Sequence, residues 1–221
     1  MQCSLYGKLP ARRDFVALGA PREFLNAWEP WLQSAISSSR HELGKEWQAA
    51  FLAAPIWRFW LGADICGRSV IGAFMSSLDG IGRYFPLTLF ACSDDDAAIP
   101  PPEFNSQDDW FDTAERLLLS TLDHDANFEE ITARIDKWPI PHQELLSPQN
   151  VIPTLVVQTE GRDFGEVFRS IRLQTHQKIF SGSTFWWTIG GDGFPPVALS
   201  GKHMPDPYVF SAMLTGAFAK T

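Results

Sequence analysis

Three short apolar segments follow one another closely in the first half of the chain, and they constrain the fold most strongly. Residues 56–61, 70–78 and 86–92 are rich in aromatic and branched side chains and are bounded by glycine, proline or charged residues. Such segments are typical of strands. The almost wholly apolar run from Leu87 to Cys92 predicts a central strand covered on both faces. Because the connections are short, we expect the three strands to pair antiparallel.

Helical spacing of apolar residues predicts the elements that cover this sheet. A stripe that includes Phe24 and Trp28 follows Pro21 and indicates a long helix. Further helices are predicted at residues 45–53, 110–122, 127–138, 163–171 and 206–218. Additional strands are predicted at residues 2–5 and 151–158, and a hairpin at residues 183–189 and 194–199. This order of elements predicts an α/β fold with a mainly antiparallel sheet flanked by helices.

Residues 93–109 differ in composition from the segments on either side. They contain three successive aspartates from Asp94 and three successive prolines from Pro100, which predict an exposed, mobile loop. We therefore divide the chain into an N-terminal sheet core at residues 1–92, this acidic proline-rich loop, and a helical and hairpin part at residues 110–221. The last part is expected to pack on the same sheet, so that the whole chain forms one domain.

The charge distribution makes several classes of partner poor candidates. The net charge is −8, and residues 93–221 hold nineteen acidic side chains against nine basic ones. Since an acidic surface repels phosphates, we expect binding neither to nucleic acid nor to anionic membranes. The sequence has no signal peptide and no apolar run long enough to span a bilayer, which predicts a cytoplasmic protein without membrane insertion. Three separated cysteines, Cys3, Cys66 and Cys92, are typical of free buried thiols.

Familiar catalytic patterns are missing from the sequence. Gly80-Ile81-Gly82 begins a glycine-rich nucleotide motif but does not complete it, and it is better interpreted as a hairpin turn. His124 is flanked by two aspartates and could be an oriented base, yet no activated nucleophile stands nearby. The five histidines show no metal-ligand spacing. We therefore expect no catalytic residue, no cofactor and no metal, and interpret the protein as a binding protein rather than an enzyme.

Aromatic and arginine residues cluster at residues 57–60, 83–86 and 185–187. Side chains alternate between the two faces of a strand, so half of each cluster can fill a core while the other half points outward. Two interpretations stay open. Exposed tryptophan and arginine are typical of interface hot spots, whereas a tryptophan-rich core would leave the arginine stems packed over it.

These clusters also carry a family resemblance. Residues 7–16 (GKLPARRDFV) resemble the opening of the TagF/ImpM family, although Arg13 stands where the family usually has glycine. Residues 55–59 (PIWRF) and 82–88 (GRYFPLT) resemble two further family segments in the expected order, and residues 183–188 are similar to a later element with two tryptophans. The resemblance is dense from about residue 5 to residue 90 and sparser beyond.

The resemblance implies a function in type VI secretion. By this resemblance, family members act as post-translational repressors of secretion by engaging a forkhead-associated (FHA) scaffold protein. The resemblance further suggests a longin- or profilin-like core. It implies binding, with these candidate interaction or motif residues: Lys8, Arg12, Asp14, Trp57, Arg58, Arg83, Tyr84, Trp186 and Trp187. Two alternatives are a small hydrolase or transferase with an unrecognised site and a structural accessory subunit of the machine.

Two hypotheses cover the charged residues of the motifs. In the structural one, Asp14 pairs with Arg58 or Arg83 and fixes the first loop against the strands. In the functional one, the arginines stay accessible and meet an acidic or phosphorylated surface of the partner.

Overall fold

A seven-stranded sheet in which all neighbouring strands are antiparallel forms the centre of the molecule. The computed structural model describes residues 3–94, 99–123, 125–141, 149–151, 154–156 and 164–218. The strand order is β2-β1-β5-β4-β3-β8-β9. The bounds are β1 (Ser4–Gly7), β2 (Val16–Leu18), β3 (Trp57–Leu61), β4 (Val70–Met75), β5 (Leu87–Cys92), β8 (Ser183–Thr188) and β9 (Val197–Lys202). The predicted α/β class with a mainly antiparallel sheet is confirmed.

The three apolar segments form the expected meander. β4 lies between β3 and β5, and β5 also pairs with β1, so it has a strand on each side. The predicted hairpin is also present, because β8 pairs with β9. β8 in turn pairs with β3, with Trp60 opposite Phe185. Strands from both ends of the sequence therefore belong to one sheet.

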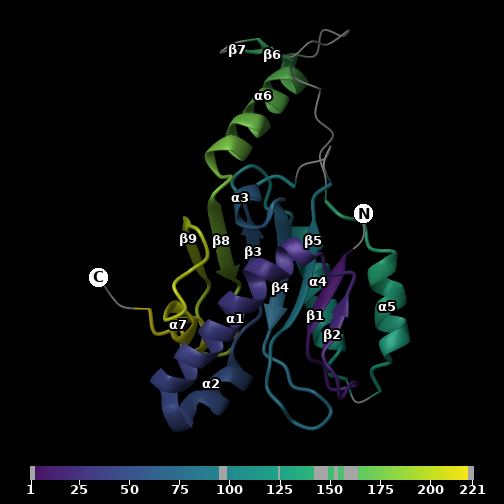
Figure 1. The fold of residues 1–221 in the computed structure, drawn as a ribbon, viewed down its shortest axis with the longest axis vertical. Helices are drawn as coiled ribbons and strands as arrows, with labels where there is room; N and C mark the ends of the chain where they lie inside the picture. Colours follow the sequence, from purple (N-terminus) through teal and green to yellow (C-terminus); the bar gives the residue numbers. More distant parts are fainter. Residues whose placement is uncertain are drawn as a thin grey trace.

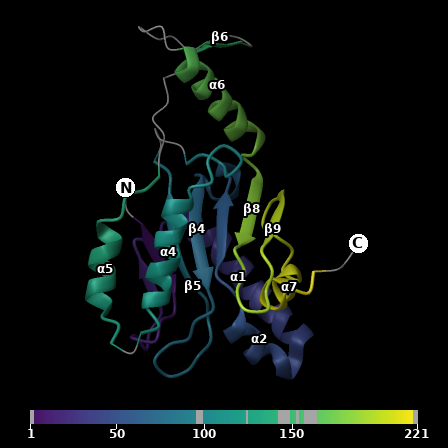
Figure 2. The ribbon, with the colours of Figure 1, turned by 180° about the vertical axis from the view of Figure 1, so that it is seen from behind.

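Helices cover both faces of this sheet (Figures 1 and 2). One face carries α1 (Arg22–Leu43), the short helix η1 (Gly44–Glu46), α2 (Trp47–Ala53), α3 (Ala63–Cys66) and α7 (Val209–Thr215). The other carries α4 (Asp108–Ser120) and α5 (Phe128–Asp136). α6 (Phe164–Ile179) extends away from the end of the sheet toward the separate pair β6 (Gln149–Val151) and β7 (Thr154–Val156). No helix among the described residues is both long enough and apolar enough to cross a membrane.

The sheet separates two hydrophobic cores. Under α1, Trp28 packs its ring against Phe24 at 5.2 Å, Phe59 at 4.5 Å and Trp186 at 5.7 Å between ring centroids. On the α4 face, Trp60 belongs to a core of aliphatic side chains and Phe111. Residues 57 and 59 thus face α1, and residue 60 faces α4, as the alternation of a strand requires.

Some element boundaries differ from the prediction. The first strand lies at residues 4–7 rather than 2–5, and β2 and α3 were not predicted because each is too short to show a periodic pattern. The segment 151–158 was predicted as one strand, but its described residues are the last residue of β6 and the whole of β7, which pair antiparallel. Asn127 caps α5 as expected, since its Oδ1 accepts hydrogen bonds from the amides of Glu129 and Glu130. α7 begins at Val209, after a turn in which the Asp206 carboxylate accepts the Tyr208 amide.

The prediction that residues 93–109 are exposed is wrong around Ile99. This side chain is fully buried, its carbonyl oxygen accepts a hydrogen bond from Trp60 Nε1 at 3.2 Å, and its amide donates to Ser69 Oγ at 3.3 Å. The neighbouring Pro100 does not disrupt these hydrogen bonds, because proline lacks only its own amide and both bonds use backbone groups of Ile99. Asp95 and Asp96 lie outside the described residues.

Candidate functional site

The first and third family segments meet at one end of the sheet. Two loops come together there, residues 8–15 after β1 and residues 78–84 before β5, and we call them the motif loop pair. The strands that lead into them pair directly, with Gly7 opposite Leu87. Gly7 has a φ of 132°, and a Cβ at this position would overlap the carbonyl oxygen of Pro86. Only glycine allows this close approach.

A buried carboxylate organises the motif loop pair. The Asp79 side chain is 0% exposed. Its Oδ2 lies 3.0 Å from Lys8 Nζ and accepts a hydrogen bond of 2.6 Å from Arg83 Nε. Its Oδ1 accepts the backbone amides of Ile81 at 3.1 Å and Arg83 at 2.9 Å. Burial opposes ionisation, but the hydrogen bonds from Arg83, Lys8 and Ile81 outweigh it and hold the pKa of the Asp79 carboxyl well below its usual range.

Further hydrogen bonds join the two loops. Arg83 Nη2 donates to the carbonyl oxygen of Arg13 at 2.7 Å, and the Gly80 amide donates to the carbonyl oxygen of Arg12 at 2.8 Å. The backbone at Arg13 does not adopt a positive φ, so an arginine is accommodated at this position without backbone strain. The first loop is therefore held against the second loop by Arg83.

The predicted acidic partner of Arg83 is wrong. Asp14 is exposed and forms no ion pair within the described part of the chain, while Arg83 and Lys8 both bind Asp79. Asp79 was missed because the sequence Leu78-Asp79-Gly80 resembles an ordinary turn. Its position four residues before Arg83 was the available signal, since an aspartate at the start of a turn often accepts amides that follow it.

The motif loop pair leaves apolar and cationic side chains at the surface. Phe15 is 43% exposed although its ring packs on Tyr6 and Phe85, and Ile81 is 58% exposed. The Arg12 guanidinium lies over the ring of Phe128 at the start of α5, 4.5 Å from its centroid. The two loops hold four basic and two acidic side chains, so they are locally positive in a chain of net charge −8.

Arg58 lies on β3 and forms a second buried charge cluster. In the sheet, β4 separates β3 from β5 and β1, the strands that lead into the motif loop pair. The Arg58 side chain is only 3% exposed and contacts acids of α4: Nε donates to Glu115 Oε1 at 2.6 Å and Nη2 to Asp112 Oδ1 at 2.8 Å. The guanidinium also lies 5.3 Å from the ring centroid of Phe111. Burial disfavours the charge, but Glu115 and Asp112 outweigh it, so the pKa of Arg58 is raised. Arg58 therefore fixes α4 to the sheet and is not accessible to a partner.

The predicted aromatic residues belong to the cores or their margins. Trp57 is buried and donates from Nε1 to the carbonyl oxygen of Met213 at 2.9 Å, and Trp186 is buried under α1. Trp187 is half-buried with its ring 4.7 Å from that of Phe111. Tyr84 is half-buried and packs against the rings of Trp47 and Phe51 on the α1 side. Of the nine predicted residues, five lie in the motif loop pair, namely Lys8, Arg12, Asp14, Arg83 and Tyr84, although the Tyr84 ring packs toward the α1 side.

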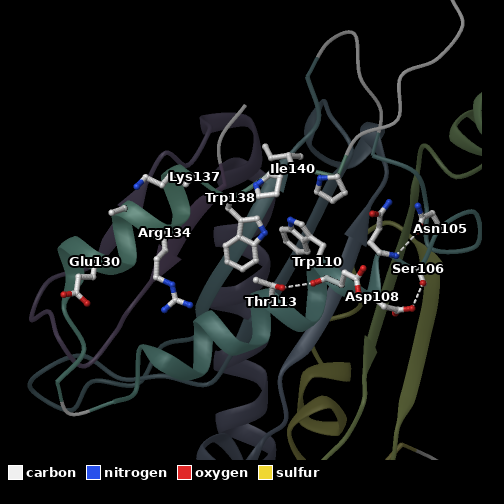
Figure 3. Close-up of a pocket in the computed structure, with 15 residues that line it drawn as sticks. Asn105, Ser106, Asp108, Trp110, Thr113, Glu130, Arg134, Lys137, Trp138 and Ile140 are labelled. Carbon is white, nitrogen blue, oxygen red and sulfur yellow. Dashed lines mark hydrogen bonds between the residues drawn. The ribbon is translucent and has the colours of Figure 1, made fainter.

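A groove of about 1250 Å³ lies between α4 and α5 (Figure 3). Its floor includes Trp110 and Trp138, whose ring centroids are 5.9 Å apart, and Arg134 projects into it from α5. Lys137 and Glu130 lie at its rim. Histidine and cysteine are absent from the lining residues, so the groove offers no nucleophile paired with an imidazole base.

Thiols and metal ligands add no second site in the part of the chain that the structure describes. No group of three or more histidine, cysteine or acidic side chains there could hold a metal ion. The three cysteines are unpaired, and burial raises the pKa of Cys66 to about 11 and that of Cys3 to about 12, which keeps them as thiols. His124 lies outside the described residues.

Comparison with known proteins identifies the family. A family model described as the TagF N-terminal domain, type VI secretion system-associated, matches residues 4–138, which is more than half of the 221 residues. The chain belongs to the TagF family. Both charge clusters of this TagF chain, and the groove between α4 and α5 up to Trp138, lie within the matched residues.

A solved structure is similar over the whole TagF chain. The crystal structure of PA0076 from Pseudomonas aeruginosa PAO1 is 30% identical in sequence and superposes with a TM-score of 0.81. The similarity covers 99% of this chain and 96% of that one, so it includes the C-terminal hairpin and α7 as well as the TagF N-terminal domain. A search of curated proteins returned no match.

Proposed function

We propose that this TagF chain is a cytoplasmic regulator that represses type VI secretion by binding a protein of the secretion system, and that this partner is its FHA-domain scaffold protein. The motif loop pair is the proposed binding surface. The observation that carries the proposal is the buried Asp79, which holds two family segments in one fixed shape while Phe15 and Ile81 stay at the surface.

A fixed loop surface favours protein binding for an energetic reason. Loops that are ordered before binding lose little conformational entropy when a partner docks, so more of the contact energy appears as affinity. Exposed apolar side chains beside arginines are typical of interface hot spots. The local positive charge would select an acidic or phosphorylated partner surface, whose oxygens can accept paired hydrogen bonds from Arg12 and Arg13.

Two alternatives are weaker on the same observations. An enzyme would need a pocket that gathers acid, base and nucleophile, and the groove between α4 and α5 instead combines an apolar floor with mixed charges at the rim. We therefore propose binding rather than catalysis. A structural accessory subunit would bind sheath or baseplate proteins in fixed proportion, which affinity purification from secreting cells would distinguish from recovery of an FHA-domain protein.

Substitution of Ile81 tests the proposal directly. Ile81→Asp places an acid at the centre of the proposed surface without touching a core, because the side chain is 58% exposed. We expect it to abolish binding to the purified FHA-domain protein and to fail to restore repression in cells that lack the native gene. Leu119→Asp is the matched control, since Leu119 is 52% exposed on the outer side of α4. Equal binding and repression by both variants would remove the motif loop pair as the interface.

A further inference from the structure

β9 forms one edge of the sheet, far from the motif loop pair. Within the described residues it pairs only with β8, and no element lies beside its outer side (Figure 1). The amide of His203, just beyond the strand, donates to the carbonyl oxygen of Gly182 at 2.9 Å and so points toward β8. Main-chain groups alternate in direction along a strand. Those of Ala198, Ser200 and Lys202 therefore point outward at the open edge.

An apolar pocket adjoins this edge. It has a volume of about 320 Å³ and is lined by Phe185 and Trp187 of β8, Ala198 and Ser200 of β9, and Pro102 and Glu103 before α4. The helices of this face lie over the other strands, and β8 and β9 have none in front of them (Figure 2). The small side chains of Ala198 and Ser200 leave a path from the edge into the pocket.

We propose that the β9 edge and this pocket bind an extended segment of a partner protein that carries one large apolar side chain. The open amides and carbonyl oxygens can pair with an added strand, which is a common way for proteins to bind peptides. Every second side chain of that strand would lie on the pocket face. A pocket of about 320 Å³ has room for one bulky apolar group. Because Pro195 and Pro196 precede β9, pairing is confined to residues 197–202.

A second copy of the chain would fit this surface poorly. Two β9 strands paired about a two-fold axis would offer each other Ala198, Ser200 and Lys202 on the pocket face, and none of these is a bulky apolar group. A six-residue strand alone also buries less surface than a stable dimer needs. The occupant is therefore a different segment. This surface is separate from the motif loop pair, so either proposal can fail without the other.

The probe is a phage-displayed library of random nonapeptides, selected on the full chain and then on a variant with a blocked edge. Ser200→Pro removes an outward amide and prevents strand addition, while the hydrogen bonds between β8 and β9 stay intact. Ser200→Thr is the control that keeps the amide. We expect selected peptides to share one large apolar residue and to bind Ser200→Pro about 10-fold or more weakly than Ser200→Thr.

Three further measurements decide whether peptides bind at the β9 edge and its pocket. Replacing the shared apolar residue by alanine should weaken binding by about 10-fold or more, because its burial is lost. Both protein variants should keep the melting temperature of the wild type to within a few degrees. If no peptide family is enriched, or if selected peptides bind Ser200→Pro as well as Ser200→Thr, the proposal is wrong. A chain mass of about twice 24.8 kDa in solution that Ser200→Pro halves would mean that a second copy occupies the edge, and would also overturn it.

Discussion

Two buried charge clusters in this protein are built in opposite ways. Asp79 is an acid whose partners include the amides and side chain of its own turn, together with Lys8 of the neighbouring loop. Arg58 is a base in β3 whose acidic partners all lie on α4, a helix distant in sequence. The first cluster fixes the shape of a surface, and the second fixes the position of a helix. A charge in a family motif can therefore be structural in two senses, with different consequences when it is removed.

The largest effect is expected from Arg58→Ala. It leaves Glu115 without its partner in a nearly buried position and opens space beside Phe111. Breaking a buried pair in this way costs about 3 kcal/mol or more. Chemical denaturation should show that loss, and Arg58→Met combined with Glu115→Gln, which removes both charges and keeps the volume, should recover most of it. An unfolding free energy within about 1 kcal/mol of wild type for Arg58→Ala would contradict the account.

A smaller loss of stability, with a larger local effect, is expected from Asp79→Asn. The new amide nitrogen would face Lys8 Nζ and Arg83 Nε, which are both donors, so the side chain must shift and the turn loses order. Arg83 is 56% exposed and can turn to water. Amide hydrogen exchange should become faster at Ile81 and Arg83, whose amides Asp79 accepts, and stay unchanged in α1. Faster exchange throughout the sheet would instead assign Asp79 a role in the whole fold.

The pH dependence of stability sharpens the same comparison. The folded pKa of Asp79 is depressed below the ordinary value near 4, so the carboxylate contributes stability that is fully present above about pH 4. That contribution is lost as the pH falls toward the folded pKa. The difference in unfolding free energy between wild type and Asp79→Asn should stay constant from about pH 7 to 5 and shrink below about pH 4. A difference that grows in acid would mean that the carboxylate is not stabilised by its hydrogen bonds.

Sequence reasoning recovered the elements whose signal is local. Some elements are long enough for the spacing of their apolar residues to distinguish helix from strand. They are α1, the meander of β3 to β5 and the hairpin of β8 and β9. β2 has only three residues and depends on its pairing with β1, so no period could reveal it. The Ile99 side chain belongs to the core on the α4 face and its backbone is bonded to Trp60 and Ser69, which the surrounding aspartates and prolines do not indicate.

The candidate site was predicted in its charges but not in its pairings. Lys8 and Arg83 were among the predicted motif residues, yet Asp79, the acid that both of them bind, lies in a turn of ordinary composition and was not predicted. In the sequence, the acids that bind Arg58 resemble the solvent-exposed side of an amphipathic helix. In the structure, 54% of the Asp112 side chain is in fact exposed. Partners from separate segments are fixed by tertiary packing, which a single sequence does not show.

The smallest effect on stability is expected from Phe15→Ala. Its ring is 43% exposed and contacts the rings of Tyr6 and Phe85 at the surface, so the loss should be about 1 kcal/mol or less. Binding to the FHA-domain protein should nevertheless weaken about 10-fold, because the same ring contributes to the proposed interface. Titration calorimetry with the purified proteins checks this, and Phe168→Ala, which changes a phenylalanine 65% exposed on α6, is the control. Equal affinities for the two variants would exclude Phe15 from the interface.

The central claim is that the motif loop pair, shaped by Asp79, is the surface that meets the secretion partner. Amide hydrogen exchange of the full chain with and without the purified FHA-domain protein tests it most directly. We predict slower exchange at residues 11–15 and 80–83 in the complex, with no change in α6. A complex that forms but leaves both loops exchanging at their free rates, or protects a different surface, would contradict the claim.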